Sequence, residues 1–291
     1  MSRYIAAVAL IGMLIFTGCE DPVPTDYIQE YVFTGYLVVD EPIQDMTLTR
    51  TQAPLDSFVY ANAAVREAQV RIWSDQDTFD LVFEEPASDT GIGAYGFPDK
   101  SVLVQPGVTY HMEARVGDGT VLTAVTTTPE RIAWVQEPRD TLQYPKDTLN
   151  LPSPDSLKLI WTRSPGITEY LISVKALDTL GYGEYLTPST EEQNRRIERF
   201  FEENAPRYND IIRWGFLQNT QVNVVWVAFK WFGLQEVTVY APDAAMLEWF
   251  KQLQFGGNQY QSLLGNVEGG IGVFGSAATV GKTVFMLKNQ P

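Results

Sequence analysis

Short runs of alternating apolar and polar residues, separated by turn sequences, constrain the fold of this chain more than any other feature. Residues 108–116 alternate strictly, and the turn around Asp118-Gly119 leads into another run over 121–127. A period of two is typical of strands with one buried face, and Asp-Gly favours the backbone of a tight hairpin. Residues 68–83 show the same arrangement of two runs around a polar stretch. This pattern predicts a β-sandwich of about 100 residues over 31–136.

After a proline-rich stretch the strand pattern resumes with additions. Four prolines fall in 137–156, where large apolar residues are few, so this stretch is predicted to be a linker. Alternating runs then indicate a second sandwich over 157–291, with a central strand at 222–229. The predicted fold class is therefore mainly β, with two β-sandwich domains and α-helices inserted in the second.

Two helical insertions are predicted in the second sandwich, at about 189–216 and 242–254. The first begins with a capping box, Ser189 followed by Glu192, and continues as a polar helix to about Asn204. The second has Pro242 near its first turn and apolar residues at helical spacing. These residues are Met246, Leu247, Trp249, Phe250 and Leu253.

The first nineteen residues carry an export signal. One positive charge, Arg3, precedes an apolar run over 5–16 that is too short to span a bilayer as a helix. Phe16-Thr17-Gly18-Cys19 resembles a bacterial lipobox, and Cys19 is the only cysteine of the chain. An uncleaved anchor or a plain signal peptide are the alternatives, and the position of this cysteine argues against both. We expect residues 1–18 to be removed and Cys19 to be acylated. Two or more acyl chains would then anchor the protein stably in the membrane.

Residues 19–30 are predicted to be a tether. Glu20 and Asp21 follow Cys19 directly, and acidic residues in this position resemble the signal for surface display in lipoproteins of Bacteroidota. The alternative is an ordinary solvated tether. We expect an outer-membrane protein on the extracellular face, held to the membrane by its acyl chains.

Charge and residue counts limit the chemistry of the chain. It has 21 Lys and Arg against 36 Asp and Glu, a net charge of −15, and no basic block. An acidic chain of this kind does not bind the negatively charged phosphates of nucleic acids, so nucleic acid is a poor partner. One cysteine and one histidine exclude a disulfide framework and the usual cysteine- or histidine-built metal centres. We expect no cofactor, no metal ligands and no catalytic residues.

Three motifs suggest chemistry, but each has a simpler structural interpretation. His111 lies on the polar side of its predicted strand, and the local sequence supplies no buried acid to hold it as a base. The carboxylates of 75–80 are ligands that calcium prefers, but the glycine of an EF-hand loop is missing, which favours a solvated hairpin tip. Residues 270–275 match G-x-G-x-x-G, but the residues that follow do not favour a helix, so a tight, close-packed loop is expected.

Aromatic residues in the second half divide into core and contact candidates. The set Trp226, Phe229, Trp231 and Phe232 falls mostly in the core by its pattern, although a stacking platform is the alternative. Four others lie in less patterned sequence and are predicted to be exposed contacts for a ligand or partner. They are Tyr182, Tyr185, Tyr208 and Trp214. The acids of 191–203 follow a solvated helical face and do not identify a glycosidase pair.

Four short segments repeat an Asp-Thr/Ser-Leu pattern, which resembles the O-glycosylation acceptor of exported Bacteroidota proteins. The alternative is that these residues start turns and strands. The candidate acceptors are Thr141, Thr148, Ser156 and Thr179.

Four segments together resemble the Bacteroidota surface lipoproteins grouped as domain of unknown function 4249. They are Cys19-Glu20, the strand-like 35–40, the Pro-Gly-Val-Thr-Tyr of 106–110, and the glycine-rich 266–275. The resemblance implies a transthyretin- or immunoglobulin-like first sandwich and a fibronectin-like second half. It also implies association with TonB-dependent outer-membrane receptors, and no catalytic residues.

The function predicted from these features is a non-enzymatic accessory or interaction subunit of a TonB-dependent receptor or a similar outer-membrane complex. Its partner would be an outer-membrane β-barrel protein. The alternatives are an independent glycan- or peptide-binding module that uses 182–216, and a carboxylate-based hydrolase.

Overall fold

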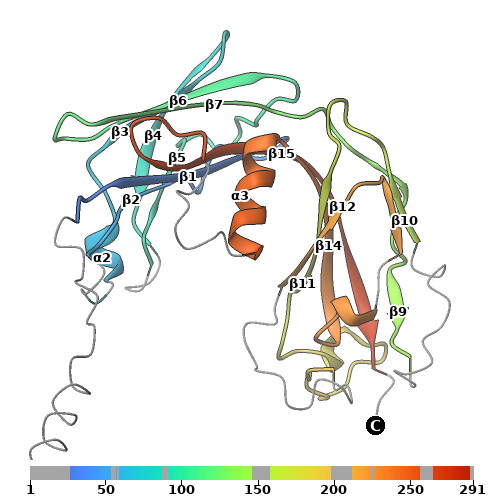
Figure 1. Ribbon diagram of the computed structural model, residues 1–291. Helices are drawn as coiled ribbons and strands as arrows, with labels where there is room; N and C mark the ends of the chain where they lie inside the picture. The colour runs from blue at the N-terminus through green and yellow to red at the C-terminus, as the bar shows by residue number, and fades with distance from the viewer. Residues whose placement is uncertain are drawn as a thin grey trace, which may run out of the picture.

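A computed structural model describes residues 27–53, 57, 59–86, 91–145, 158–197, 212–223, 226–255 and 265–288. The described part of the chain is mainly β, as the sequence predicts, and contains strands in three sheets and one longer helix (Figure 1). None of the helices in these ranges has the length and apolar character that a bilayer crossing requires.

The described elements follow one another in this order. The first half contains β1 (Tyr31–Val38), β2 (Thr47–Arg50), α2 (Tyr60–Ala63), β3 (Gln69–Trp73), β4 (Thr78–Glu84), β5 (Ala94–Gly96), β6 (Thr109–Arg115) and β7 (Val121–Thr127). The second half contains β8 (Trp134–Gln136), β9 (Thr141–Gln143), β10 (Lys158–Trp161), β11 (Tyr170–Ala176), the 3-10 turn η2 (Gly183–Tyr185), β12 (Ile212–Leu217), β13 (Gln221–Asn223), the 3-10 turn η4 (Trp226–Ala228), β14 (Gly233–Pro242), α3 (Ala244–Phe255) and β15 (Ile271–Leu287).

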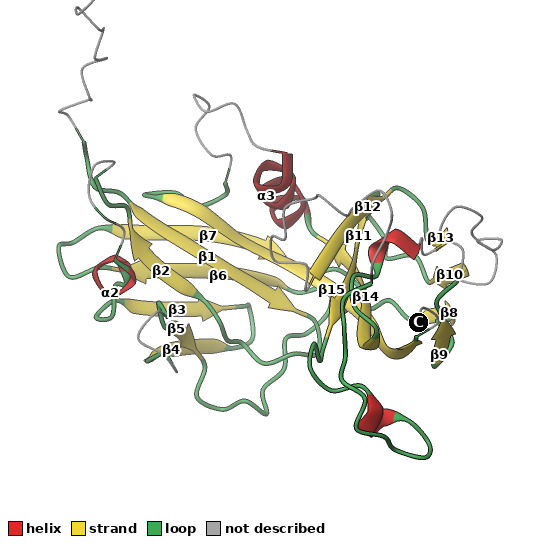
Figure 2. Cartoon of the chain, turned by 90° about the horizontal axis from the view of Figure 1, so that it is seen from below, coloured by secondary structure: helices red, strands yellow, loops and turns green. Residues whose placement is uncertain are grey.

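Strand β15 belongs to both halves of the molecule. It lies in a seven-stranded sheet of order β12-β11-β14-β15-β1-β2, with β9 paired to its far end. Its first part runs parallel to β1, from Val32 beside Ile271 to Val38 beside Ala277. From Ala277 onward it runs antiparallel to β14. Figures 1 and 2 show this strand passing from one body into the other. We call β1–β7 with the first part of β15 the N-terminal lobe. We call β8–β14 with the remaining part of β15 the C-terminal lobe.

Each lobe packs one face of this long sheet against a second sheet. In the N-terminal lobe, Phe33 and Phe274 meet the inner residues of the five-stranded sheet β5-β4-β3-β6-β7. In the C-terminal lobe, Val237 and Met286 meet Leu159 and its neighbours from the three-stranded sheet β13-β10-β8. Both lobes are therefore sandwiches, because alternate residues of the shared sheet line their cores.

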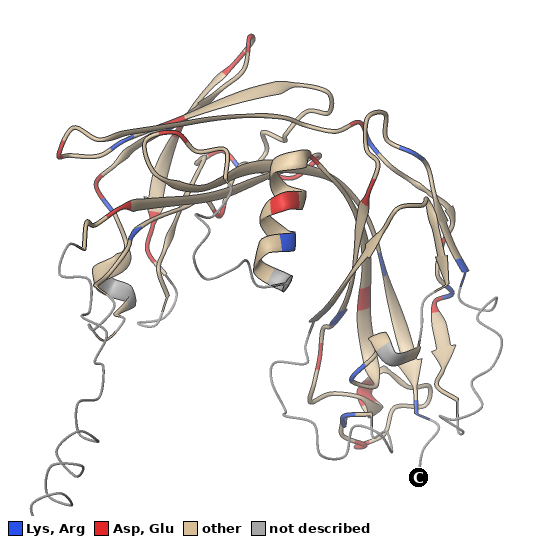
Figure 3. Cartoon of the chain, in the orientation of Figure 1, with Lys and Arg blue, Asp and Glu red and all other residues tan. Residues whose placement is uncertain are grey.

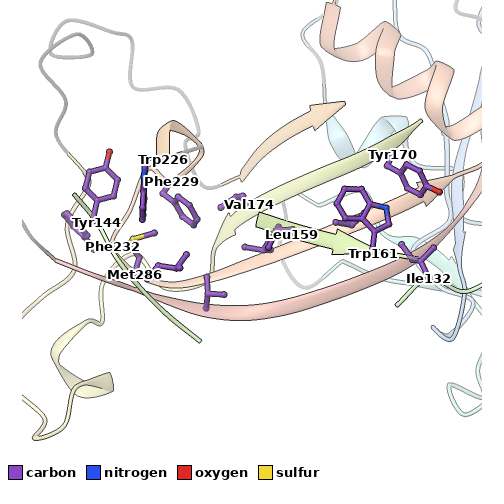
Figure 4. Packing of buried hydrophobic residues seen from close by; sticks show 14 of the residues in the cluster. Ile132, Tyr144, Leu159, Trp161, Tyr170, Val174, Trp226, Phe229, Phe232 and Met286 are labelled. Atoms are coloured by element: carbon purple, nitrogen blue, oxygen red, sulfur yellow. The ribbon is translucent and has the colours of Figure 1, made fainter. Parts of the chain in front are cut away.

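Aromatic rings fill the core of the C-terminal lobe (Figure 4). Trp161 packs edge-to-face on Tyr170 with 5.6 Å between ring centroids, and Tyr144 packs in the same way on Trp226 and on Phe232. Trp161, Tyr144 and Phe232 have at most 1% of their surface exposed. Rings in such edge-to-face pairs contribute more than their buried area alone, so this cluster stabilises the lobe.

Three sequence predictions about individual elements are wrong. The helical insertion expected at 189–216 is contradicted at both ends: residues 189–197 form no helix and make isolated bridges, such as Gly181 with Gln193, and 212–216 lie in β12. Its middle, 198–211, lies outside the described residues. The central strand expected at 222–229 ends at Asn223 and is followed by the 3-10 turn η4. Residues 271–275, expected in a loop, are the start of β15.

The second predicted helix is present as α3, and the predicted domain organisation needs two changes. Strand β9 lies inside the stretch 137–156 that was predicted to be a linker, and it pairs with β15. The first part of β15 belongs to the sandwich that was expected to end at residue 136. The two sandwiches are thus joined through a shared sheet, and the remaining residues of the linker, 146–156, lie outside the described ranges.

Candidate functional site

The face of the long sheet opposite the two cores carries aromatic residues from both lobes. The shared sheet bends where the lobes meet, and α3 lies on the inner side of the bend (Figure 1). Strand register places Phe216, Leu171 and Tyr240 in one row across β12, β11 and β14. Tyr36 lies beside Gly275 on the same side of the sheet. We call Tyr36, Trp214, Phe216, Tyr240 and Phe250 the inner aromatic cluster.

The rings of this cluster contact one another across four elements. Trp214 of β12 lies 5.2 Å from Phe250 of α3 and 5.3 Å from Tyr240 of β14, measured between ring centroids. Tyr36 of β1 lies 5.9 Å from Phe250. All of these side chains are only partly buried, so they pack α3 onto the sheet and still reach solvent. Burial raises the pKa of both Tyr36 and Tyr240, and the negative charge of Asp243 adds to the rise at Tyr36. Both phenols are therefore neutral hydrogen-bonding groups near neutral pH.

A glycine sets how closely α3 approaches the sheet. A Cβ atom on Gly275 would lie 2.8 Å from the Cβ of Met246 and 3.0 Å from its backbone nitrogen. Such distances are far inside van der Waals contact, so only glycine allows the first turn of α3 to sit on β15. The close packing expected of this glycine-rich segment is present, although in a strand.

Asp243 caps α3 and ties it to the N-terminal lobe. Its Oδ1 accepts a hydrogen bond from the Met246 backbone N–H at 2.8 Å, the usual contact of an N-cap residue. Its Oδ2 accepts one from Thr126 of β7 at 2.5 Å, and Thr126 also contacts Ser276 of β15 at 2.7 Å. Burial raises the pKa of Asp243, and the hydrogen bonds that it accepts oppose that rise.

A shallow hollow of about 540 Å³ lies beside α3 at the junction of the lobes. Its lining comes from β7, the first turns of α3 and the segment before β15. Asn266 borders it and closes the seam between β7 and β15. The Asn266 side chain bonds both backbone groups of Phe274, at 2.9 and 2.8 Å, and donates to the Val125 carbonyl at 3.0 Å.

An ion pair holds the other end of α3. Lys251 contacts Glu169, in the segment before β11, at 2.8 Å, and both side chains are largely shielded from solvent. Figure 3 shows the one acidic and the one basic residue of this helix, Glu248 and Lys251. The helix is thus fixed at its start by Asp243, in its middle by the aromatic rings and near its end by Glu169.

The four predicted contact residues do not form one site. Trp214 belongs to the inner aromatic cluster. Tyr182 is only 3% exposed, so the prediction that it is an exposed contact is wrong. Its hydroxyl accepts a hydrogen bond from the Lys288 backbone, and its ring packs on Phe285. Tyr185 is 42% exposed and also packs on Phe285. Tyr208 lies outside the described residues.

The other candidate positions are distributed over the molecule. Thr141 is exposed on β9 and Thr179 is partly exposed, whereas Cys19, Thr148 and Ser156 lie outside the described residues. The ring of His111 stacks on Trp73 on the outer face of the N-terminal lobe, with 5.3 Å between centroids. Within the described ranges, no three His, Cys, Asp or Glu side chains come together as a metal site would require, and this includes the 75–80 hairpin.

Sequence reasoning missed most of the inner aromatic cluster. Tyr36 lies in a stretch, 31–38, whose two faces are both apolar, which indicates a strand covered on both sides. Phe250 lies on the apolar stripe of the predicted second helix. Together these two signals predict that something covers a second face of the β1 sheet, but they do not identify α3 as the cover.

Comparison with known proteins gives one family. The model of the family described as domain of unknown function (DUF4249) matches residues 20–283. No curated protein and no solved structure matches the chain.

Proposed function

The chain belongs to the DUF4249 family, and from this premise we propose that it is a lipid-anchored, non-enzymatic interaction protein of a bacterial outer membrane. In this proposal it acts on the extracellular face as an accessory subunit of a TonB-dependent β-barrel receptor. The lipobox-like Phe16–Cys19 and the acidic residues after it support the anchor and its surface position. The family resemblance supports the choice of partner.

The inner aromatic cluster is the observation that carries the proposal of a contact function. Its rings come from β1 of the N-terminal lobe, from β12 and β14 of the C-terminal lobe, and from α3 between them. A partner segment that enters the inner side of the bend would contact both lobes at once. Tyr and Trp are enriched among the residues that dominate binding energy at protein interfaces.

The surroundings of the cluster support a preformed binding surface. Asp243, Gly275 and the Lys251–Glu169 pair fix α3 at separate points. A rigid surface loses little conformational entropy when a partner binds, which favours affinity without a large interface.

The experiment measures receptor capture by the full-length protein. An affinity-tagged protein is extracted from its own membranes in mild detergent, and the co-purifying barrel is quantified by mass spectrometry. Trp214→Ala should lower the captured TonB-dependent barrel by about 30-fold, the effect of losing about 2 kcal/mol at a central aromatic contact. Trp73→Ala is the matched control, because Trp73 is also partly buried but lies on the outer face of the N-terminal lobe.

Two results would overturn the proposal. One is that no TonB-dependent barrel co-purifies with the wild-type protein. The other is that Trp73→Ala lowers capture as much as Trp214→Ala while both variants keep the wild-type unfolding temperature. Specific retention of a glycan or peptide by the isolated protein, lost in Trp214→Ala, would instead favour an independent binding module.

A further inference from the structure

The loop after β11 presents exposed apolar side chains at the end of the C-terminal lobe remote from α3. Leu177, Leu180 and Tyr185 are 44%, 80% and 42% exposed. Strand β11 runs away from the inner aromatic cluster. Leu171, near its start, pairs with Tyr240 of that cluster, and the last residue of the strand pairs with Gln235. We call Leu177, Leu180 and Tyr185 the apolar tip. Isolated surface leucines are ordinary, but here Asp178 bonds both the Leu180 backbone and the Tyr185 hydroxyl, which holds these two residues in one turn.

A single carboxylate holds the shape of this tip. Asp178 Oδ1 accepts hydrogen bonds from the backbone N–H groups of Leu180 and Gly181, both at 2.8 Å. Asp178 Oδ2 accepts one from the Tyr185 hydroxyl at 2.9 Å. These hydrogen bonds lower the pKa of Asp178, so the carboxylate is ionised and the turn is held at neutral pH. The same carboxylate thus positions two of the three tip residues.

The loop is also braced against the rest of the lobe. The Asn194 side chain donates to the carbonyls of Asp178 and Phe232, at 2.6 and 2.8 Å. Backbone bonds join Gly183 to Glu192 and to Thr190. The ring of Tyr185 rests on Phe285 of β15. Leu180 therefore lies on a loop whose backbone is fixed by hydrogen bonds. A contact residue held in this way loses little conformational entropy when a partner binds.

The exposed charges on the loop 177–192 are acidic, whereas Lys175 at the end of β11 is an exposed base. Glu184 and Glu191 are exposed on the same loop. The nearby Lys288 pairs with Glu192 at 3.0 Å, lies over the ring of Tyr182 and has only 10% of its side chain exposed. A partner that covers the leucines would bring its own charges beside Glu184 and Glu191, and basic side chains complement them.

We propose that the apolar tip docks into an apolar pocket bordered by Lys and Arg side chains on a protein partner. A second copy of this chain is a poor partner, because it would bring the same acidic rim and a net charge of −15. An anionic lipid surface is disfavoured for the same reason. This contact is separate from the inner aromatic cluster and goes beyond the proposed function.

Photocrosslinking in the native membrane tests this inference. A benzoylphenylalanine is introduced at Leu180 of the full-length protein, and the crosslinked peptides are sequenced by mass spectrometry. We expect one dominant protein product, crosslinked at an apolar segment flanked by Lys or Arg. The double charge reversal Glu184→Lys with Glu191→Lys should lower its yield at least about tenfold, because close charge pairs at interfaces are worth more than 1.4 kcal/mol.

Two further variants make the test specific. Asp178→Ala should lower the yield although all three apolar side chains remain, because the hydrogen bonds that fix the loop are lost. The crosslinker placed at Val135, which is 66% exposed on β8, is the matched control and should not give the same product. Dominant crosslinks to lipid or to a second copy of the chain would overturn the inference. A yield unchanged by charge reversal would do so as well.

Discussion

At the scale of single residues, Asp243 connects the helix α3 to its surroundings. It caps α3, accepts a hydrogen bond from Thr126 of the N-terminal lobe and lies near the phenol of Tyr36. A carboxyl group in this position loses hydration when it ionises, which is why its pKa is raised. The helix that contributes Phe250 to the inner aromatic cluster thus begins at a group whose charge depends on pH.

The first prediction concerns the pH dependence of stability at this residue. Because the pKa of Asp243 in the folded chain lies above its ordinary value of 3.8, the folded state binds more protons than the unfolded state between the two values. The free energy of unfolding should therefore fall as the pH rises through this window. Asp243→Asn keeps a capping oxygen and removes the titration, so its stability relative to wild type should increase with pH. Urea denaturation at a series of pH values from 4 to about 7 measures this difference.

Asp118 supplies the control for this measurement. Its pKa is lowered from the ordinary value of 3.8 by hydrogen bonds from Thr120 and from Tyr31, so Asp118→Asn should shift the pH dependence in the opposite direction only at low pH and should parallel wild type above about pH 5. Parallel pH profiles for wild type and Asp243→Asn would contradict the account of Asp243.

The residue scale also shows where sequence reasoning fails for the site. Tyr182 lies in unpatterned sequence, which favoured an exposed contact, yet the structure buries it. The cause is a strand far along the chain: Phe285 packs on its ring and the Lys288 backbone bonds its hydroxyl. Trp214 was identified as a contact residue by the same reasoning, but the rings that pack on it come from β14 and α3. Local sequence carries no information on such distant neighbours.

At the scale of elements, the packing of α3 on β15 depends on the missing side chain of Gly275. The second prediction is that Gly275→Val lowers the free energy of unfolding by about 1–3 kcal/mol, because the added methyl groups collide with Met246. The same variant should separate Phe250 from Trp214 and so weaken receptor capture. Urea denaturation and the capture assay measure the two effects.

Gly117→Ala is the matched control, since a Cβ atom there meets nothing within 4 Å and its backbone is not in the left-handed region. It should leave both stability and capture unchanged. A Gly275→Val protein as stable as Gly117→Ala would show that α3 does not depend on this close approach.

The elements that the sequence predicted wrongly have physical explanations. A capping box at Ser189 is worth about 1 kcal/mol, and the bridges of Gln193 and Arg196 to distant residues outweigh it. The apolar run 222–229 fits a buried 3-10 turn as well as a strand, because periodicity does not separate short apolar segments. By contrast, the strands with strict alternation, such as β6 and β7, appear where the sequence places them.

At the scale of the whole molecule, the sequence predicts two sandwiches, whereas the structure joins them through one strand. The pairing of Val32 with Ile271 spans most of the chain, and no local pattern reveals it. The number of sandwiches follows from spacing and turns, but their connection follows only from which strands pair. A linker was expected at 137–156 because prolines break strands. That signal gives no information on which strands outside 137–156 pair with each other.

The third prediction is that the two lobes unfold together. Trp161→Ala empties a fully buried position in the C-terminal lobe and should cost about 3–5 kcal/mol. Because β15 is part of both cores, amides of β6 in the N-terminal lobe should lose protection in step with those of β10. Hydrogen exchange followed by mass spectrometry measures both strands in one experiment.

The exposed Val82, on the outer face of the N-terminal lobe, provides a control, and Val82→Ala should leave protection in both lobes unchanged. Loss of protection confined to β10 and its neighbours would show that the lobes are independent units.

The position of β15 late in the chain has a consequence for biosynthesis. During synthesis most strands of both sandwiches are made before Ile271, and until β15 is made each sandwich lacks a strand from the interior of its sheet. Exposed sheet edges of this kind invite mispairing, so a nascent chain of this protein needs protection until the final segment arrives. We expect its maturation to depend on chaperones, and a chain truncated before residue 271 to be cleared by proteases in both halves alike.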